Sequence, residues 1–362
     1  MSDAAVSPVH ASLRVAVAGV SGYAGGELVR LLLNHPRLRS TPPLLLARLG
    51  EADATPAALT HLHPQFSGLG AADQMQVLPF TWEQLQRQSV DLLLLATPHE
   101  QSRAWAPHAL AHGMRVIDLS GAWRLQQEQH RAVYKLVDAD PSLAAALQSE
   151  AIYGSPELHA DAIRKARLVA NPGCYATSIV LALEPLVRAE VLDLDHGVVC
   201  DAKSGVSGAG KALTPNNLFM HAADNFSAYA VFGHRHTGEL LEQLGLSADQ
   251  FQFTPHLLPI PRGILSTIYI RLRQRSEPAA IQAIFDRFYA KAPLVRVRRS
   301  PQLPQIQYVV RSNYCDVGFH IGPDGRRMVL VSCLDNLLKG AASQAVENLN
   351  LMAGWDQAEG LR

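Results

Sequence analysis

Largely apolar runs of four to six residues alternate with longer mixed segments along the first 170 residues of the chain. The runs that we expect to form strands are residues 13–18, 44–47, 92–96, 115–120 and 167–170, with helices at residues 27–34 and 105–112. Strands that are apolar throughout are typical of a parallel sheet covered on both faces. Their alternation with helices predicts an α/β domain with a mostly parallel sheet.

The pattern changes beyond residue 190. Shorter segments are predicted to form strands at residues 197–202, 251–258, 266–273, 294–298, 316–320 and 327–333, with helices at 238–244 and 278–290. Many strands with few helices between them predict an α+β domain with a mainly antiparallel sheet. A last helix over residues 337–352 carries Lys339 and Glu347. We expect it to pack on the first domain, so the predicted domains are 1–173 with 335–362, and 174–334.

Composition limits the partners and the compartment. The chain has 362 residues, of which 48% are apolar and 18% charged, so two domains can each bury a core. Its 32 basic and 32 acidic residues cancel, which predicts no nucleic-acid or membrane partner, and its apolar runs are too short to span a bilayer. The four cysteines form no CxxC pair. We therefore expect a soluble cytoplasmic protein with neither disulfides nor a metal site.

A glycine-rich turn links the first predicted strand to the first predicted helix. It has the spacing G-x-x-G-x-x-G and contains Gly19, Ser21, Gly22, Tyr23, Ala24 and Gly25. Strand, glycine turn and helix in this order are what a Rossmann-type dinucleotide site requires, because the glycines let the backbone approach a pyrophosphate and the helix N-terminus stabilises its charge. The alternative is a plain tight turn. We predict that these six residues bind the cofactor.

The end of the second predicted strand bears on which cofactor is bound. An NAD-preferring site holds the ribose 2′-hydroxyl with Asp or Glu at this position, whereas this chain has Arg48. An arginine can pair with a 2′-phosphate, so Arg48 favours NADP(H). The alternative is an ordinary exposed arginine after a strand.

A Pro-Gly turn delivers Cys174 to the predicted start of a helix that continues through Glu184. A thiol at that position faces unpaired backbone N–H groups and the positive end of the helix dipole. Both favour the thiolate, so its pKa, normally about 8.5, is expected to fall by a unit or more. The structural alternative is a buried, inert cysteine.

Two histidines, His234 and His236, flank an arginine at the start of another predicted helix. One of them could accept the proton of Cys174 and later return it. Glu239, one turn further on, could orient a histidine or complement the helix dipole. A zinc site at these histidines lacks convincing further ligands, so no metal is predicted.

Further polar groups are candidates for anion contacts. Ser120 and Arg124 follow the fourth predicted strand, and Ser204 and Gly205 open a glycine-serine loop with backbone donors for a cofactor or a phosphate. Arg262 lies between prolines and a glycine, and its planar fork suits a carboxylate or phosphate. The alternative for the loop that begins with Ser204 and Gly205 is a mobile surface loop, and the alternative for Arg262 is a structural ion pair.

These groups together predict a specific chemistry. A cysteine attacks a carbonyl carbon, the adduct exchanges hydride with a nicotinamide, and the thioester passes to phosphate. The reaction is that of a phosphorylating aldehyde dehydrogenase or, in reverse, an acyl-phosphate reductase. The alternatives are an NADP-binding regulatory protein without activity and a cysteine hydrolase, which would need no nucleotide turn.

The chain resembles the N-acetyl-γ-glutamyl-phosphate reductases of arginine biosynthesis, a semialdehyde-dehydrogenase-like family. The motifs that carry the resemblance are residues 19–28 (GVSGYAGGEL), 116–125 (VIDLSGAWRL), 153–158 (YGSPEL), 171–178 (NPGCYATS), 204–211 (SGVSGAGK), 234–240 (HRHTGEL), 259–265 (PIPRGIL) and 335–342 (DNLLKGAA). They span nearly the whole chain in the family's order. This chain has Gly238 where the family usually has proline, and Ala122 where it commonly has an acidic residue.

The resemblance implies reduction of N-acetyl-γ-glutamyl phosphate by NADPH, with release of inorganic phosphate, in a homodimer or homotetramer. It implies that Cys174 is the nucleophile and His236 the acid/base, with His234 as second choice. Its motifs add Asn171 to the expected substrate contacts and Asn336 to the expected cofactor contacts. A related lysine-pathway reductase acts on an N-blocked α-aminoadipyl phosphate, and one methylene is worth only about 1–3 kcal/mol, so that alternative stays open.

Overall fold

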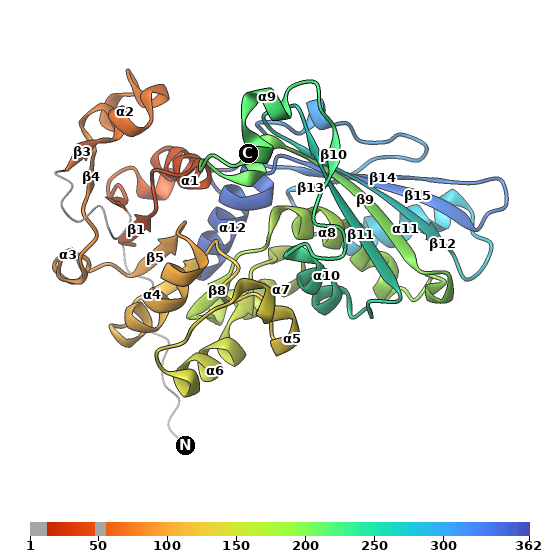
Figure 1. The fold of residues 1–362 in the computed structure, drawn as a ribbon, viewed down its shortest axis with the longest axis horizontal. Coiled ribbons are helices and arrows are strands. Elements are labelled where there is room, and N and C mark those ends of the chain that lie inside the picture. Colours follow the sequence, from red (N-terminus) through yellow and green to blue (C-terminus); the bar gives the residue numbers. More distant parts are fainter. Residues whose placement is uncertain (1–12, 48–55) are drawn as a thin grey trace.

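The computed structural model describes residues 13–47 and 56–362, which form two β-sheets lying side by side (Figure 1). The first sheet has the strand order β3-β4-β2-β1-β5-β6-β8-β7. Its strands are β1 Val15–Ala18, β2 Leu44–Leu46, β3 Ala57–Ala58, β4 Gln76–Leu78, β5 Leu92–Leu95, β6 Arg115–Asp118, β7 Ile152–Tyr153 and β8 Leu168–Ala170. Every pairing is parallel except β3 with β4, which confirms the predicted parallel sheet.

Helices cover both faces of this sheet because its strands are buried on both sides. In β1, Val15 and Val17 pack into one core with α1 and α12, whereas Ala16 and Ala18 pack into a second core with α4 and α6. The helices around this sheet are α1 Tyr23–Asn34, α2 Leu59–Leu62, α3 Trp82–Arg87, α4 His99–Ala111, α5 Glu128–Arg131, α6 Pro141–Glu150, α7 Pro156–Lys165 and α12 Ser343–Met352. The alternation of side chains in β1 thus divides the two cores.

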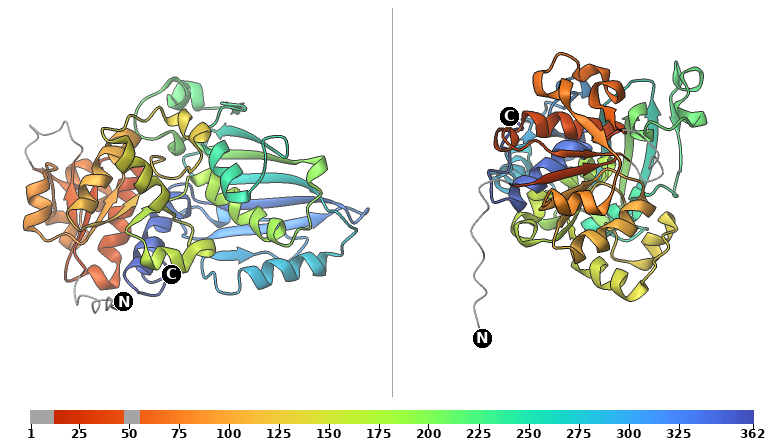
Figure 2. Two further views of the ribbon diagram at one scale, coloured as in Figure 1. Left: turned by 90° about the horizontal axis from the view of Figure 1, so that it is seen from below. Right: turned by 90° about the vertical axis from the view of Figure 1, so that its left-hand side faces the viewer.

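The second sheet has the order β10-β11-β9-β12-β15-β14-β13. Its strands are β9 Val198–Gly205, β10 Ser227–Ala228, β11 Phe251–Leu258, β12 Ile264–Arg271, β13 Val295–Val297, β14 Cys315–Ile321 and β15 Arg327–Leu334. Its pairings are antiparallel except β11 with β9 and β13 with β14, as the mainly antiparallel prediction requires. Figure 2 shows its long strands extending away from the first sheet.

One face of the second sheet carries the helices α8 Cys174–Arg188, α10 His236–Leu244 and α11 Pro278–Phe288, which share a single core with it. A short helix, α9 Phe219–Ala222, lies outside this core. Val199 of β9 and Tyr269 of β12 are exposed. The helical face brings Cys174, the first residue of α8, to the boundary between the two sheets.

The chain returns to the first sheet after β15. Its path begins as a π-helical turn, Leu338–Ala342, and continues as α12, which packs against α1 and α7. The segment at 337–352 is thus not one regular α-helix as predicted, although it packs where we expected. The domain boundaries at residues 173 and 335 stay a prediction.

Candidate active site

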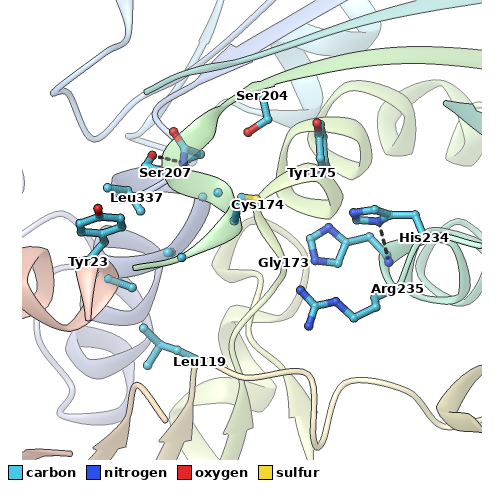
Figure 3. Close-up of a pocket in the computed structure, with 18 of the residues that line it drawn as sticks. Tyr23, Leu119, Gly173, Cys174, Tyr175, Ser204, Ser207, His234, Arg235 and Leu337 are labelled. Carbon is cyan, nitrogen blue, oxygen red and sulfur yellow. Dashed lines mark hydrogen bonds between the residues drawn. The ribbon is translucent and has the colours of Figure 1, made fainter. Parts of the chain in front are cut away.

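A pocket of about 530 Å³ lies where the two sheets meet. Its walls come from the start of α1, the start of α8, the loop after β9 and the loop before α10. Figure 3 shows Tyr23 on one side of Cys174 and His234 on the other. The pocket therefore places the predicted nucleotide turn and the predicted nucleophile in one cavity.

The glycine turn has the shape that a nucleotide phosphate requires. Gly19 has a φ of +84°, and a Cβ there would lie 2.3 Å from the Ala96 carbonyl oxygen. The helix α1 begins at Tyr23, four residues earlier than predicted, so its free first-turn amides fall inside the motif. Gly22, Tyr23, Ala24 and Gly25 line the pocket, whereas Gly19 and Ser21 do not line it and instead form the turn behind it. The arrangement suits a pyrophosphate at a helix N-terminus.

The other expected cofactor contacts divide into three groups. Ser204 and Asn336 line the pocket. Gly205 does not line it, because its N–H donates to the Gly263 carbonyl and its Cα lies against the backbone of Arg262, so its cofactor contact stays a prediction. Arg48 lies outside the described residues.

Cys174 occupies the first position of α8, half-buried at the pocket wall. Two glycines leave room for the cysteine and for the neighbouring His236. A Cβ on Gly340 would lie 2.7 Å from the Cys174 Cβ, and a Cβ on Gly173 would lie 2.4 Å from Nε2 of His236. The close packing therefore brings the imidazole of His236 against the turn that holds the cysteine.

The thiol is less acidic than the sequence predicts. Burial raises the pKa of Cys174 to about 11, although the Tyr175 backbone N–H and the charge of Arg124 act in the opposite direction. The expectation of a lowered pKa is thus wrong for this structure, because desolvation outweighs the helix N-terminus. A base is needed to remove the proton when the thiol reacts.

His236 is the better placed of the two candidate bases. Burial, with the charges of His234, Arg124 and Arg235, lowers the pKa of His236 well below its usual value, so the imidazole is neutral and can accept a proton. His234 accepts the His236 backbone N–H at Nδ1, 3.1 Å away, and its Nε2 lies 3.4 Å from the Tyr229 hydroxyl. Because both nitrogens of His234 are engaged, the geometry favours His236 as the acid/base.

Glu239 anchors the cysteine turn. Its carboxylate is fully buried and accepts the Gly173 N–H at 2.8 Å, the Tyr153 hydroxyl at 2.7 Å and an Arg124 N–H at 3.3 Å. None of its hydrogen bonds goes to a histidine among the described residues, so the prediction that it orients one is wrong. Charge-assisted bonds of this kind fix the backbone on which Cys174 sits.

Of the four predicted substrate contacts, only Arg124 lines the pocket. Ser120 donates to Asp118 and accepts the Ala122 N–H, which closes the loop after β6. Asn171 is buried between the Ala341 carbonyl and Asn348. Neither residue lines the pocket, because each bonds to buried neighbours, and their substrate contacts stay a prediction.

Arg262 also serves the structure. Its guanidinium pairs with Glu27 of α1 and, at 3.5 Å, with Asp335 after β15. The ion pair ties the second sheet to the helix of the nucleotide turn, which supports the alternative of a structural ion pair, and the substrate contact of Arg262 stays a prediction.

The departures from the family pattern have local explanations. A Cβ at Gly238 would lie 2.6 Å from the Cβ of His130, so a neighbouring helix occupies the space of the usual proline ring. Arg124, next to the unusual Ala122, is held by the carbonyls of Leu119 and Asn171 and by Glu239. Its orientation therefore needs no acidic residue at position 122.

Several pocket residues were not predicted. These are His99, Tyr134, Tyr175, Lys211, Tyr229 and Arg235. His99 follows the apolar strand predicted at residues 92–96, and Arg235 lies between the two histidines, so either position could have marked the residue as part of the site. The tyrosines come from separate elements that only folding brings together.

No group of three or more His, Cys, Asp or Glu side chains within residues 13–47 and 56–362 is placed to hold a metal ion. None of the helices in these ranges is long and apolar enough to cross a membrane.

Known proteins are similar in sequence to this chain along almost its whole length. The chain is 40% identical over 354 residues to the N-acetyl-gamma-glutamyl-phosphate reductase of Campylobacter jejuni subsp. doylei, which covers 97% of this chain and 98% of that protein. It is 41% identical over 353 residues to the protein of the same name from Desulfotalea psychrophila, with coverage of 96% and 98%. The chain belongs to the N-acetyl-gamma-glutamyl-phosphate reductase family. The resemblance inferred from the motifs is confirmed.

Two domain models match the chain, and solved structures share its fold. Residues 14–166 match the semialdehyde dehydrogenase NAD binding domain, and residues 174–336 match the semialdehyde dehydrogenase dimerisation domain. Aspartate semialdehyde dehydrogenase II from Vibrio cholerae, complexed with ASA, has a TM-score of 0.68 at 19% identity, covering 95% of this chain and 98% of that one. The Candida albicans enzyme with NADP has a TM-score of 0.67 at 15% identity, covering 94% and 98%. These structures show the fold, and the predicted fold class is confirmed.

Members of the reductase family are oxidoreductases of amino-acid biosynthesis, and this chain carries their NAD(P)-binding domain. In this structure the NAD(P)-binding domain and Cys174 contribute to the same pocket, because the start of α1 and Cys174 both line it.

Titration of Cys174 in this reductase should show the effect of burial. With a pKa of about 11, iodoacetamide should alkylate Cys174 about tenfold faster for each unit of pH between 7 and 10, without a plateau. Peptide mass spectrometry would measure the rate, with the buried Cys200 as the unreactive internal control. A plateau below pH 8.5 would show that the helix N-terminus prevails over burial.

Proposed function

We propose that this chain reduces N-acetyl-γ-glutamyl phosphate to N-acetylglutamate γ-semialdehyde and inorganic phosphate through a thioester on Cys174. The observation that carries the proposal is the shared pocket, in which the nucleotide turn at Tyr23 and the thiol of Cys174 face each other across the space where a nicotinamide and an acyl group would meet. The relatives named as reductases of this phosphate support the choice of substrate.

The first half of the reaction uses the neutral thiol and the neutral imidazole. Cys174 gives its proton to His236 while its sulfur attacks the γ-carbonyl carbon, and the bond between that carbon and the phosphate oxygen breaks. Phosphate leaves with the electron pair and takes the proton from His236. The amides at the start of α8 and the charge of Arg124 stabilise the negative charge that develops nearby.

The second half returns the enzyme to its resting state. The start of α1, with Ser204 and Asn336, would hold a nicotinamide nucleotide, which would supply the hydride that converts a thioester to the aldehyde level. The Cys174 sulfur is then the leaving group, and His236, reprotonated from solvent, gives it a proton. Glu239 holds Gly173 throughout, so the sulfur stays where its backbone places it.

The experiment that tests this function follows the reaction in reverse. NADPH formation from NADP and N-acetylglutamate γ-semialdehyde is recorded by absorbance with and without phosphate, beside the N-blocked α-aminoadipate semialdehyde. Turnover of the shorter aldehyde that depends on phosphate is expected. A preference for the longer aldehyde would assign the chain to the lysine pathway, which the names of its relatives do not favour.

NADP(H) is the proposed cofactor, on the argument from Arg48 in the sequence. Arg48→Glu should raise the Kd of NADPH about tenfold or more, because a carboxylate would repel the 2′-phosphate, and should change that of NADH much less. Fluorescence titration of both nucleotides measures the difference. An equal loss for both would remove the argument.

We further infer that the active form is a homodimer or homotetramer in the cytoplasm. The match of residues 174–336 to a dimerisation domain supports the oligomer, and the exposed Val199 and Tyr269 lie on the sheet face opposite α8, α10 and α11. Size-exclusion chromatography with light scattering tests it, and a monomer at working concentration would contradict it.

A further inference from the structure

The imidazole of His99 lies between two hydrogen-bond donors. The Gly121 backbone N–H is 2.8 Å from its Nδ1, and Nη1 of Arg235 is 2.7 Å from its Nε2. A neutral imidazole has one accepting nitrogen, while a backbone amide and a guanidinium can only donate. One of the two contacts therefore sets a donor against a donor.

The backbone contact decides where the proton of His99 lies. Gly121 belongs to the rigid loop after β6, and its amide fixes Nδ1 as the acceptor, which leaves the proton on Nε2. Burial, with the charge of Arg235, lowers the pKa of His99 to about 4, so the ring stays neutral at physiological pH. The Nε2–H of His99 and the guanidinium of Arg235 are thus two donors that face each other at 2.7 Å.

The charge of Arg235 is also uncompensated. Arg124, the other arginine of the pocket, is buried, is paired with Glu239, and donates Nε–H and one Nη2–H to two backbone carbonyls. Lys211 donates to the carbonyl of Ser21 in the nucleotide turn. Within the described part of the chain, Arg235 forms no ion pair, and its Nη1 contacts the neutral His99.

The position of Arg235 places this charge on the substrate side of the thiol. It directly precedes His236, and Figure 3 shows its side chain beneath His234, across Cys174 from Tyr23. Both Arg235 and His99 line the pocket. A ligand that reaches Cys174 from the side opposite the nucleotide turn would meet them.

We propose that Arg235 and Nε2–H of His99 together bind an oxyanion of the substrate. An oxyanion accepts hydrogen bonds from both groups, which removes the donor–donor contact and neutralises the free charge. This inference rests on the proposed function, whose substrate carries two such groups, a carboxylate and a phosphoryl group. A carboxylate presents two acceptor oxygens in a plane, and a phosphoryl group presents three in a tripod. A guanidinium can donate to either set.

The test compares Arg235→Met with Arg87→Met, an exposed arginine of α3 outside the pocket, and with Arg235→Lys. The KM for phosphate and the KM for the semialdehyde are measured separately in the oxidative direction. Arg235→Met should raise at least one of them tenfold or more, with a smaller change in kcat, and Arg235→Lys should recover part of the loss. A rise for phosphate identifies the phosphoryl group, and a rise for the semialdehyde identifies the carboxylate. Unchanged values for both would overturn the proposal.

His99→Phe supplies the second arm. It keeps an aromatic ring beside Tyr134, with which His99 makes an edge contact at 4.7 Å, but removes the Nε2 donor. Because a neutral donor contributes less than a charged one, we expect the same KM to rise about three- to tenfold. A change in the KM of the other substrate instead would contradict a shared site.

A binding experiment separates failure of this inference from failure of the proposed function. Inorganic phosphate and N-acetylglutamate are added to the cofactor-loaded enzyme, and the shift in thermal midpoint is recorded. At least one should stabilise the unmodified protein and Arg87→Met but not Arg235→Met. Equal shifts in all three would overturn the anion site even if turnover were intact, and a shift lost with Arg235→Met would support it even if neither aldehyde were a substrate.

Discussion

Cys174→Ala is expected to lower reductase turnover by about four orders of magnitude or more and to leave nucleotide binding unchanged. The sulfur makes the bond on which both half-reactions depend, and loss of a catalytic nucleophile has effects of this size or larger in other enzymes. Alanine keeps the Cβ that packs against Gly340, so α8 should still begin at position 174. Turnover is measured from NADPH absorbance, and nucleotide binding from fluorescence.

The matched control is Cys200→Ala. This cysteine is fully buried in β9, away from the pocket, so the variant should keep turnover within a few-fold of the original. Turnover retained in Cys174→Ala would remove the covalent mechanism. A parallel loss of nucleotide affinity would show that the substitution disturbs the pocket rather than the chemistry.

Lys339→Met is expected to lower the free energy of unfolding by about 3–5 kcal/mol, which is the cost of breaking a buried ion pair by removing one partner. Lys339 Nζ lies 2.5 Å from Glu157 of α7 and also pairs with Glu347 of α12, and all three side chains are fully buried. Although burial opposes it, the two carboxylates raise the pKa of Lys339 above its usual value. Without the ammonium, two carboxylates would remain in a dry interior. Urea unfolding monitored by circular dichroism measures the loss.

Glu347→Gln is the control for this cluster. It leaves the pair of Lys339 with Glu157 in place, so it should cost less than Lys339→Met. Burial raises the pKa of Glu347 from 4.5 to about 7, so the folded protein binds this proton more tightly than the unfolded chain. Its contribution to stability is greatest below about pH 4.5, falls as the pH rises to about 7 and is level above it, and Glu347→Gln should remove that slope. Equal losses for both variants would contradict the central place of Lys339.

Local sequence pattern accounts for much of the fold. Residues 251–258 were predicted as a strand with the bounds that β11 has, because apolar residues alternate along them and turn residues follow. The glycine turn and the Pro-Gly turn before Cys174 depend on neighbours in the sequence, and both lie where they were expected. The two-residue strands β3, β7 and β10 carry too few residues for a pattern and were missed.

Long-range partners account for what the sequence could not show. Glu239 was expected to orient a histidine or complement a helix dipole, and Arg262 to contact the substrate, but both bind groups that are distant in the chain, Gly173 and Glu27. Nothing near Lys339 in the sequence indicates that Glu157 will face it. The pKa of Cys174 depends on how much water the folded pocket excludes, and a helix N-terminus alone does not determine that.

The most direct test of the Cys174 thioester is the mass of the enzyme during half a reaction. N-acetyl-γ-glutamyl phosphate is generated in place by a kinase with ATP, nucleotide cofactor is omitted, and the acid-quenched protein is analysed by intact and peptide mass spectrometry. One N-acetylglutamyl group should appear on the peptide that contains Cys174, disappear when NADPH is added, and be absent in Cys174→Ala. An active enzyme that carries no adduct, or carries it on another residue, would contradict the thioester mechanism.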